Sequence, residues 1–222
     1  KPFVTLTYAQ SIDSKIAAHP GARTVLSGPE SKAMTHYLRS QHDAILIGVG
    51  TAIADNPSLS CRIKGRQNFS PRPIILDPTL RWNPDSTSKL VENIKSQKGK
   101  APYIIACSHA IGKNQQNRGF WEKIGAEVIY LPSSETKDGH ILAWDDVLRT
   151  LGDLGVSSVM VEGGATVIRQ LLAYDNLVDS FIITIAPKFL GTEGPSAGPV
   201  TELCLRDTKW LSVGEDTVLL GR

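Results

Sequence analysis

Short apolar runs recur along the chain and are bounded by proline, glycine or charged residues. Runs of this length that are rich in β-branched side chains are typical of buried strands. We therefore expect a strand in each of them. The runs are PFVTLTY (2–8), DAILIGVG (43–50), PRPIILDP (71–78), APYIIACS (101–108) and AEVIYLP (126–132).

Segments of a second kind fall between these runs and have polar and apolar residues at helical spacing. The first begins with Pro29 and Glu30, which suit the first turn and the positive end of a helix. Met34, Tyr37 and Leu38 then give this segment one apolar face. The segments predicted as helices are SGPESKAMTHYLRSQ (27–41), SKLVENIK (88–95), NQQNRGFWEKIG (114–125) and AWDDVLRTLGDLG (143–155).

The last third of the chain continues this alternation and then departs from it. Residues 157–175 predict a strand, a glycine turn and a helix, and residues 177–191 predict a long strand that ends at Pro187. Residues 208–222 contain a Gly-Glu-Asp turn and predict a hairpin. The whole pattern indicates an α/β fold, with a central mixed, mostly parallel sheet, helices on both faces and a C-terminal antiparallel hairpin. We expect one domain over residues 1–222.

Composition narrows the class of protein. The net charge is +2 with acidic and basic residues interspersed, which gives no electrostatic case for a nucleic-acid binder. No apolar stretch has the length of a membrane span. Cys61, Cys107 and Cys204 are far apart and odd in number, so we expect reduced thiols, no metal site and a cytoplasmic location. The chain begins at Lys1 rather than Met, so a targeting segment could have been trimmed.

The segment VMVEGGATVIRQLL carries the most chemical information. Paired glycines, Gly163 and Gly164, follow a strand and precede a helix, so the backbone can approach a ligand closely. The N–H groups at the start of the helix favour a phosphate, and Thr166 adds a hydroxyl. Glu162 falls at the carboxyl end of the strand, where open α/β sheets bind ligands. A tight turn with a solvent-exposed carboxylate explains the same residues, and the sequence leaves both interpretations open.

The segment LIGVGTAIADNPSLSCR (46–62) repeats this logic. It is not the GxGxxG fingerprint of dinucleotide-binding folds, because Ile53 occupies the third glycine position. One interpretation is a short helical turn that Thr51 caps and Asp55 ends, with Pro57 preventing its continuation. The other is a polar loop that faces a cofactor.

Other charged residues are weak signals one at a time. Arg39 and Arg62 flank the second segment, and arginine forks match phosphate oxygens. Asp13 and Lys15 follow the first strand and form a surface ion pair in the simplest interpretation. Residues 191–199 are rich in turn formers, which fits either a mobile flap or a solvated connection. The chain has no phosphate-binding GxxxxGK[ST] loop, no GxSxG elbow and no zinc-deaminase signature.

Four segments together carry a family resemblance. They are AQSIDSK (9–15), LR (38–39) before DAILIGVGTAIADNPSLSCR (43–62), VEGGA (161–165) and IAPKFLG (185–191). In combination they resemble the reductase domain of riboflavin biosynthesis. The resemblance covers residues 3–221. It implies a dihydrofolate-reductase-like fold, usually as a homodimer, and the NADPH-dependent reduction of the ribosyl group of a pyrimidine 5′-phosphate to ribityl. The family often has glycine where this chain has Ser14, which weakens the case for a tight turn there.

The resemblance also implies roles for individual residues. Cofactor contacts are expected from Thr51, Asp55, Glu162, Gly163, Gly164, Ala165 and Thr166. Substrate contacts are expected from Arg39, Leu59, Arg62 and Glu162, with the arginines at the 5′-phosphate. Lys15, Glu162 and water are the candidates for a general acid. No metal is implied.

Without a deaminase signature in the chain, the resemblance is to the stand-alone fungal and archaeal reductases. These reduce 2,5-diamino-6-ribosylamino-4(3H)-pyrimidinone 5′-phosphate before it is deaminated. The alternatives are a reductase of the same fold that acts on the deaminated pyrimidine or on a pteridine or folate, and a non-catalytic regulator that binds NADPH.

Overall fold

The computed structural model describes residues 1–85, 87–136, 139–174, 176–199 and 202–222. All five apolar runs form strands, and so do the segments expected to form the last strand and the hairpin. The strands are β1 (Phe3–Gln10), β2 (Ala44–Gly48), β3 (Arg72–Leu76), β4 (Tyr103–Cys107), β5 (Glu127–Leu131), β6 (Ser133–Thr136), β7 (Gly139–Leu142), β8 (Ser158–Gly163), β9 (Ser180–Ile185), β10 (Lys209–Val213) and β11 (Asp216–Gly221).

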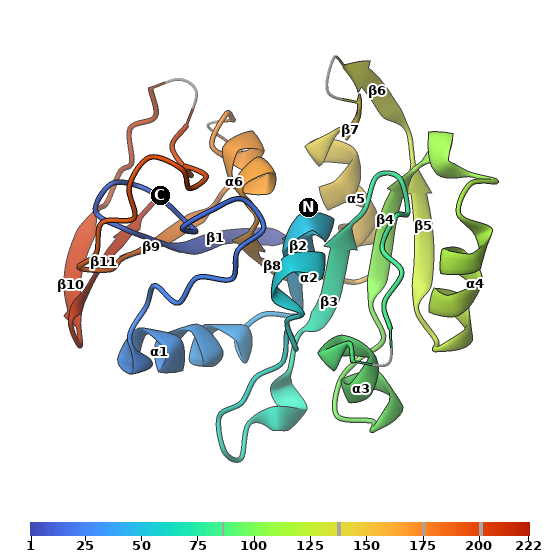
Figure 1. The fold of residues 1–222 in the computed structure, drawn as a ribbon, viewed down its shortest axis with the longest axis horizontal. Coiled ribbons are helices and arrows are strands. Elements are labelled where there is room, and N and C mark those ends of the chain that lie inside the picture. Colours follow the sequence, from blue (N-terminus) through green and yellow to red (C-terminus); the bar gives the residue numbers. More distant parts are fainter. Residues whose placement is uncertain (86, 137–138, 175, 200–201) are drawn as a thin grey trace.

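Within the described residues, nine strands form one sheet in the order β10-β11-β9-β1-β8-β2-β3-β4-β5. Figure 1 shows this sheet crossing the molecule from β10 at the left to β5 at the right. The pairs from β9 to β5 are parallel, whereas β11 is antiparallel to both β9 and β10. The mixed, mostly parallel sheet and its C-terminal hairpin are as the sequence predicts.

The predicted helices are also present, most of them with shorter bounds. Pro29 opens the first one, and the Ser88 hydroxyl accepts a hydrogen bond from the Val91 N–H at the start of another. The helix after the paired glycines ends before Asp175, the last residue of its predicted segment, which lies outside the described residues. The helices are α1 (Pro29–Arg39), α2 (Val49–Asp55), α3 (Lys89–Lys95), α4 (Gln115–Lys123), α5 (Trp144–Asp153) and α6 (Ala165–Leu171).

Two apolar layers cover the two faces of the sheet. Alternate residues of a strand point to opposite faces, so Leu46 of β2 packs with α5 and α6, whereas Ile45 and Ile47 pack with α2, α3 and α4. Trp121 of α4 is fully buried in the second layer, and its Nε1 donates to the Trp82 carbonyl at 3.3 Å. Helices therefore lie on both faces, which confirms the predicted fold class.

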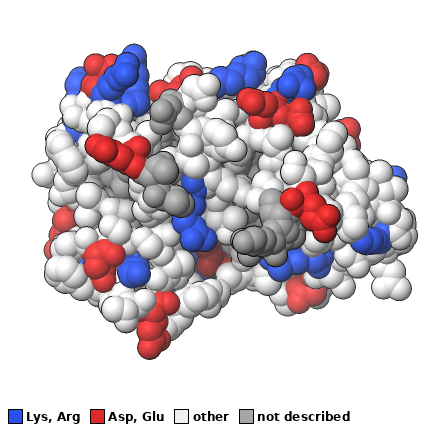
Figure 2. All heavy atoms as spheres, turned by 90° about the horizontal axis from the view of Figure 1, so that it is seen from above, with Lys and Arg blue, Asp and Glu red and all other residues white. Residues whose placement is uncertain are grey.

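The surface of the molecule carries mixed charge on the face that Figure 2 shows, with acidic and basic side chains interspersed. Among the described residues, none of the helices is long and apolar enough to cross a membrane.

Two features differ from the sequence prediction. Residues 133–142 contain the hairpin of β6 and β7, which was not predicted, because SSETKDGHIL has no apolar alternation. Residues 191–199 pack against the segment that follows β1. Ser196 forms a bridge with Lys15, Ala197 is fully buried, and a Cβ on Gly194 would overlap the Ala17 carbonyl oxygen. This segment is thus a packed connection in the structure.

Candidate active site

Two glycine-containing turns lie side by side near the middle of the sheet. β2 ends at Gly48 and α2 follows directly. β8 ends at Gly163, and a single residue, Gly164, separates it from α6. The two strands are parallel neighbours, and Ile47 is paired with Gly163. Both turns therefore lie at the same edge of the sheet, at the carboxyl ends of its strands, where open α/β sheets bind ligands.

Glycine is required at these turns for two reasons. Gly163 has a φ of +139°, which residues with a side chain rarely adopt. The peptide bond between Gly163 and Gly164 is cis. A Cβ on Gly164 would lie 2.7 Å from Oγ1 of Thr51, and a Cβ on Gly48 would lie 3.1 Å from Cγ2 of Val167. Without these side chains, α2 and α6 can begin in close contact.

The first turns of α2 and α6 have no side-chain cap. Their N-cap residues are Gly48 and Gly164, both in extended conformation. Thr51 lies inside the first turn of α2, so the interpretation in which it caps a helical turn is wrong about the cap, although the helical turn is present. Ala165 is partly buried, and Thr166 is exposed. Backbone N–H groups of both first turns therefore remain available to acceptor groups of a ligand.

Asp55 is the last residue of α2, as the sequence predicts. Burial raises the pKa of Asp55, and the positive charge of Arg23 opposes this shift only in part. The helix stops because Asn56 adopts a left-handed conformation, with a φ of 43°. The Asn56 side chain donates to the Thr87 carbonyl at 2.8 Å, which anchors the end of α2 to the segment before α3.

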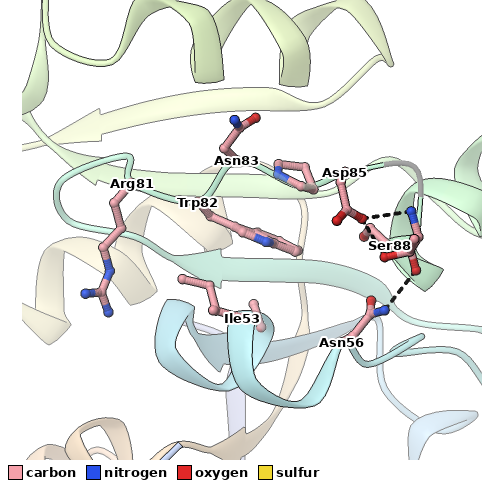
Figure 3. A pocket seen from close by; sticks show the side chains of 10 residues that line it. Ile53, Asn56, Arg81, Trp82, Asn83, Asp85 and Ser88 are labelled. Carbon is pink, nitrogen blue, oxygen red and sulfur yellow. Dashed lines mark hydrogen bonds between the residues drawn. The ribbon is translucent and has the colours of Figure 1, made fainter.

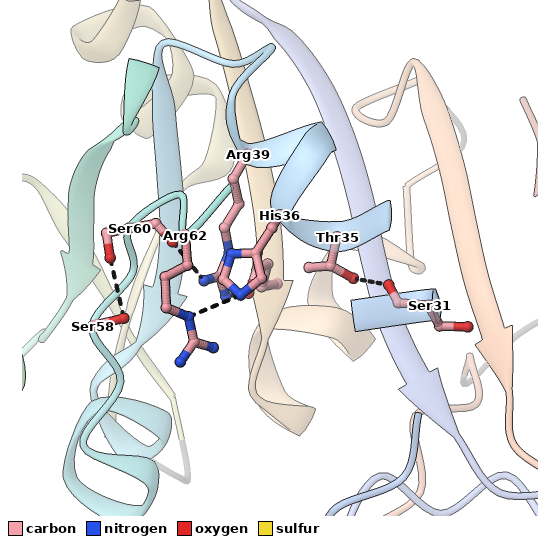
Figure 4. Close-up of polar contacts among 8 residues, drawn as sticks. Ser31, Thr35, His36, Arg39, Ser58, Ser60 and Arg62 are labelled. Atoms are coloured by element: carbon pink, nitrogen blue, oxygen red, sulfur yellow. Dashed lines mark hydrogen bonds and ion pairs between the residues drawn. The ribbon is translucent and has the colours of Figure 1, made fainter. Parts of the chain in front are cut away.

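A bidentate ion pair lies next to the second turn, and Figure 4 shows its arginine, Arg39, at the end of α1. Nε and Nη2 of Arg39, the last residue of α1, donate to the two carboxylate oxygens of Glu162 in β8, at 2.7 and 2.6 Å. Nη1 of Arg39 donates to the Ser60 carbonyl at 3.1 Å. The two side chains are only 12% and 16% exposed. Burial is the largest single influence on the pKa of Arg39 and lowers it, but the charge and the hydrogen bonds of Glu162, with a smaller effect of Cys61, together outweigh burial, so the pKa is raised.

A second arginine lies beside this pair. Nε of Arg62 donates to Nε2 of His36 at 3.0 Å, and His36 lies on α1, one helical turn before Arg39. Burial, together with the positive charges of Arg39 and Arg62, lowers the pKa of His36 to about 4, although Glu162 acts in the opposite direction. His36 is therefore neutral at physiological pH.

Lys15 lies in a turn that closes on itself. The Lys15 N–H donates to Oγ of Ser11, and its carbonyl accepts from the Ser11 N–H. Ser14 has a φ of 59°, so a residue other than glycine adopts the left-handed conformation in this turn. The carboxylate of Asp13 accepts hydrogen bonds from the N–H groups of Leu190 and Gly191. Asp13 thus joins this turn to the 191–199 connection, rather than pairing with Lys15.

A hollow of about 350 Å³ lies beside α2 (Figure 3). Figure 3 shows Arg81 and Asp85 on either side of Trp82, at the two ends of the hollow. The hollow lies along α2, the helix that also follows the first glycine turn. Its lining residues are Ala52, Ile53, Asn56, Arg81, Trp82, Asn83, Pro84, Asp85, Thr87 and Ser88.

Comparison with known families identifies this arrangement. The sequence model of the family described as the RibD C-terminal domain matches residues 2–219. The chain belongs to this family. A relative from Debaryomyces hansenii, named 2,5-diamino-6-ribosylamino-4(3H)-pyrimidinone 5′-phosphate reductase, is 45% identical over all of this chain and 90% of its own length. The relative of the same name from Saccharomyces cerevisiae is 41% identical over all of this chain and 86% of its own length.

Solved structures agree with this family assignment. The riboflavin biosynthesis reductase Rib7 of Saccharomyces cerevisiae has a TM-score of 0.79 and 39% identity, over all of this chain and 89% of that one. Dihydrofolate reductase from Enterococcus faecalis has a TM-score of 0.51 and 12% identity, over 99% of this chain and 95% of that one. The second match shows the fold alone, and this fold is the one that the family resemblance implied.

In this member of the RibD C-terminal domain family, the residues named from the sequence fall into two groups. Thr51, Gly163 and Gly164 meet between α2 and α6, whereas Arg39, Arg62 and Glu162 surround the end of β8. Glu162 joins the groups, since it precedes Gly163 directly. The side chain of Leu59 is only 2% exposed and packs in the core with α2 and α3. Only its main chain can therefore face a substrate.

Two residues of this RibD-type site were not named as site residues from the sequence. They are His36 and Ser60, and both act through hydrogen bonds to neighbours that are distant in sequence or on another element. The only signal for His36 is its spacing of three residues from Arg39 on a helix, which places both side chains on one face. Ser60 contributes a main-chain carbonyl, which no residue pattern can indicate.

Proposed function

We propose that the chain is an NADPH-dependent reductase that converts 2,5-diamino-6-ribosylamino-4(3H)-pyrimidinone 5′-phosphate to the ribitylamino product. One observation supports this most: Glu162 links the Arg39 guanidinium to the glycine turn that Thr51 approaches. A charged pair on the substrate side therefore lies next to a backbone turn suited to a dinucleotide. The names of the yeast relatives support the choice of substrate.

On this proposal, the glycine turns hold the cofactor. The N–H groups beside Gly164, together with Ala165 and Thr166, bind its pyrophosphate, because glycine lets the backbone approach and the first turn of a helix favours anions. Thr51 and Asp55 contact the cofactor from α2. The hollow beside α2 takes the nucleoside end, where Arg81 can meet the adenosine 2′-phosphate. Bound there, NADPH supplies a hydride from its nicotinamide C4.

The remaining residues act on the substrate. Arg62 binds the 5′-phosphate, Arg39 and the main chain of Leu59 line the same side, and Glu162 fixes the position of the Arg39 guanidinium. The ribosyl ring opens to an imine, C1′ accepts the hydride, and the nitrogen accepts one proton, so that the ribitylamine forms. Lys15 and bound water are the groups proposed to supply that proton. Glu162, the third candidate from the sequence, accepts hydrogen bonds from Arg39 at both carboxylate oxygens and therefore orients rather than protonates. The main contribution of the protein is to align the two reactants.

Two further proposals follow from the family resemblance. The protein acts as a homodimer. It acts in the cytoplasm, which the three free cysteines support because free thiols are usual in reducing compartments.

Deuterium transfer tests the chemistry directly. The substrate is incubated with NADPH that is deuterated at C4 in either stereochemical position, and the product is examined by mass spectrometry. We expect one cofactor isomer to place a single deuterium at C1′ and the other to place none. Product without deuterium from either isomer would contradict the hydride transfer. Dihydrofolate serves as the comparison substrate, and its reduction at a similar rate would favour the pteridine alternative.

The alternative of a non-catalytic regulator makes a different prediction. Such a protein binds NADPH and leaves the pyrimidine unchanged. The ion pair of Arg39 and Glu162 beside the glycine turn argues against it, because cofactor binding alone does not require charged groups on the substrate side.

A further inference from the structure

His36 is a partly buried neighbour of the substrate-side arginines that has no role so far. It comes from α1, and its ring lies between Arg39 and Arg62, as Figure 4 shows. Its Nε2 accepts the hydrogen bond from Nε of Arg62 at 3.0 Å. Its Nδ1 is buried and has no hydrogen-bond partner among the described residues. The ring is thus placed by packing, by the hydrogen bond with Arg62 and by its approach to the main chain of Ser60.

The two arginines differ in the nitrogens that they leave available. All three nitrogens of Arg39 donate to Glu162 or to the Ser60 carbonyl. In contrast, Arg62 is exposed and uses only Nε among the described residues, in its bond to His36. Figure 4 shows both terminal nitrogens of Arg62 pointing away from His36. This pair of nitrogens is free to form a bidentate contact with an anion.

The contact fixes the protonation state of His36. An arginine can only donate hydrogen bonds, so Nε2 of His36 carries no proton and the neutral ring holds its proton on Nδ1. A protonated ring would lose this hydrogen bond and add a third positive charge beside Arg39 and Arg62. The lowered pKa, which results from burial and from these two charges, keeps the ring neutral. The carboxylate of Glu162 is the acidic group that opposes this effect.

We propose that His36 is a positioning residue that holds Arg62 by its Nε and so directs its two terminal nitrogens to the 5′-phosphate of the substrate. This inference rests on the proposed function for the identity of the phosphate. A long, exposed arginine otherwise samples many rotamers, and ordering it on binding costs affinity. A neutral acceptor on a rigid helix removes part of this cost before the substrate arrives.

The experiment compares variants by their affinity for ribose 5-phosphate, measured by isothermal titration, and by the KM for the pyrimidine substrate. His36→Phe keeps a ring and removes the acceptor, whereas His36→Gln keeps an acceptor. We expect His36→Phe to weaken binding of ribose 5-phosphate about tenfold and to raise the KM for the pyrimidine by a similar factor. We expect kcat and the Kd of NADPH to change less than about twofold, and His36→Gln to recover most of the affinity.

A double variant separates positioning from a general structural effect. In an Arg62→Ala background, His36→Phe should weaken ribose 5-phosphate binding less than about twofold, because the residue acts only through Arg62. Tyr37→Phe, on the exposed side of the same helix, is the matched control and should leave all values unchanged. The inference is overturned if His36→Phe has the same effect with and without Arg62, if it weakens NADPH equally, or if wild-type protein does not bind ribose 5-phosphate.

A nitrogen-15 spectrum of labelled histidine provides an independent check. The proposal expects His36 to be neutral at pH 7 with its proton on Nδ1, and a proton on Nε2 would contradict it. These outcomes are separable from the proposed function. Protein that binds ribose 5-phosphate through His36 and Arg62 but reduces no pyrimidine would refute only the function. Protein that reduces the pyrimidine with normal KM after His36→Phe would refute only the positioning role.

Discussion

Arg39 and Arg62 differ in how many of their nitrogens are already hydrogen-bonded within the protein. Both flank the same motif, and the family resemblance implies that both lie at the 5′-phosphate. In the structure, Glu162 binds two nitrogens of Arg39, and the chain separation of this pair is 123 residues. Contacts over such a distance depend on the fold and cannot be inferred from local spacing. The identity of the charged residues is therefore predictable, but the distribution of their tasks is not.

Replacement of Glu162 by Gln tests the ion pair. The variant keeps one acceptor for Arg39 and removes the negative charge. We expect kcat/KM to fall at least about tenfold and the free energy of unfolding to fall by about 1–3 kcal/mol, since a largely buried guanidinium loses its charged partner. Steady-state kinetics and urea denaturation measure the two effects.

Glu122→Gln is the matched control for this variant. Glu122 also pairs with an arginine, Arg118, but both side chains are more than a third exposed. Exposed pairs contribute little, so we expect a change below about 0.5 kcal/mol and normal activity. Equal effects of the two substitutions would show that the position of Glu162 has no special importance.

At the scale of elements, the site depends on the two turns that place α2 and α6 against each other. The sequence indicates both turns through their glycines, and it gives the strands correctly because apolar runs report burial directly. Prediction from the sequence fails for elements that are not marked by buried apolar residues. The hairpin of β6 and β7 is polar, so the apolar pattern could not reveal it. The start of α2 could not be inferred either, because this helix begins without a side-chain cap.

Replacement of Gly164 by Ala tests the contact between these elements. The new Cβ would lie 2.7 Å from Oγ1 of Thr51, so either the Thr51 side chain must change rotamer or the turns must move apart. We expect the Kd of NADPH to rise at least about tenfold and the free energy of unfolding to fall by about 1–3 kcal/mol. Fluorescence titration and thermal unfolding measure these changes.

Gly119→Ala provides the comparison, because nothing lies within 4 Å of a Cβ at that position in α4. It should leave NADPH affinity unchanged and raise stability by about 0.5–1 kcal/mol, as alanine favours a helix over glycine. An unchanged NADPH affinity in the Gly164 variant would argue against a cofactor site between the two turns.

The connection of residues 191–199 depends on Asp13. Hydrogen bonds from the Ser11 hydroxyl and from the N–H groups of Leu190 and Gly191 lower the pKa of Asp13 to about 2. An unfolded Asp has a pKa of about 3.9, so this stabilisation is complete above that pH and is lost as the pH falls toward 2. Asp13→Asn should therefore be less stable than wild type at neutral pH, and the difference should shrink in acid. A difference that stays constant from pH 6 to pH 2 would contradict this assignment.

At the scale of the whole molecule, the mostly parallel sheet makes β2 and β8 neighbours, so that side chains or main chain of α1, of α2 and of residues 60–62 reach the end of β8 or a neighbour there. Residues from four separate segments therefore meet at Glu162 and the paired glycines. The topology follows from the alternation of strands and helices, which the sequence shows, but the strand order does not follow from it. β8 inserts between β1 and β2, and only this order makes the two glycine turns neighbours.

The proposed homodimer is tested by the mass of the protein in solution. Sedimentation equilibrium should give twice the 24.1 kDa of the chain at micromolar concentration. A mass of one chain under the conditions of the activity assay would show that the site functions without a second copy.

The most direct test of the proposed function is the rate of NADPH oxidation with two substrates side by side. One is 2,5-diamino-6-ribosylamino-4(3H)-pyrimidinone 5′-phosphate, and the other is its deaminated analogue. Both compounds are measured under identical conditions. We predict a higher kcat/KM for the diamino compound, as the names of the yeast relatives suggest. Preference for the deaminated compound would contradict the proposed substrate. Binding of NADPH without oxidation by either compound would contradict the reductase itself.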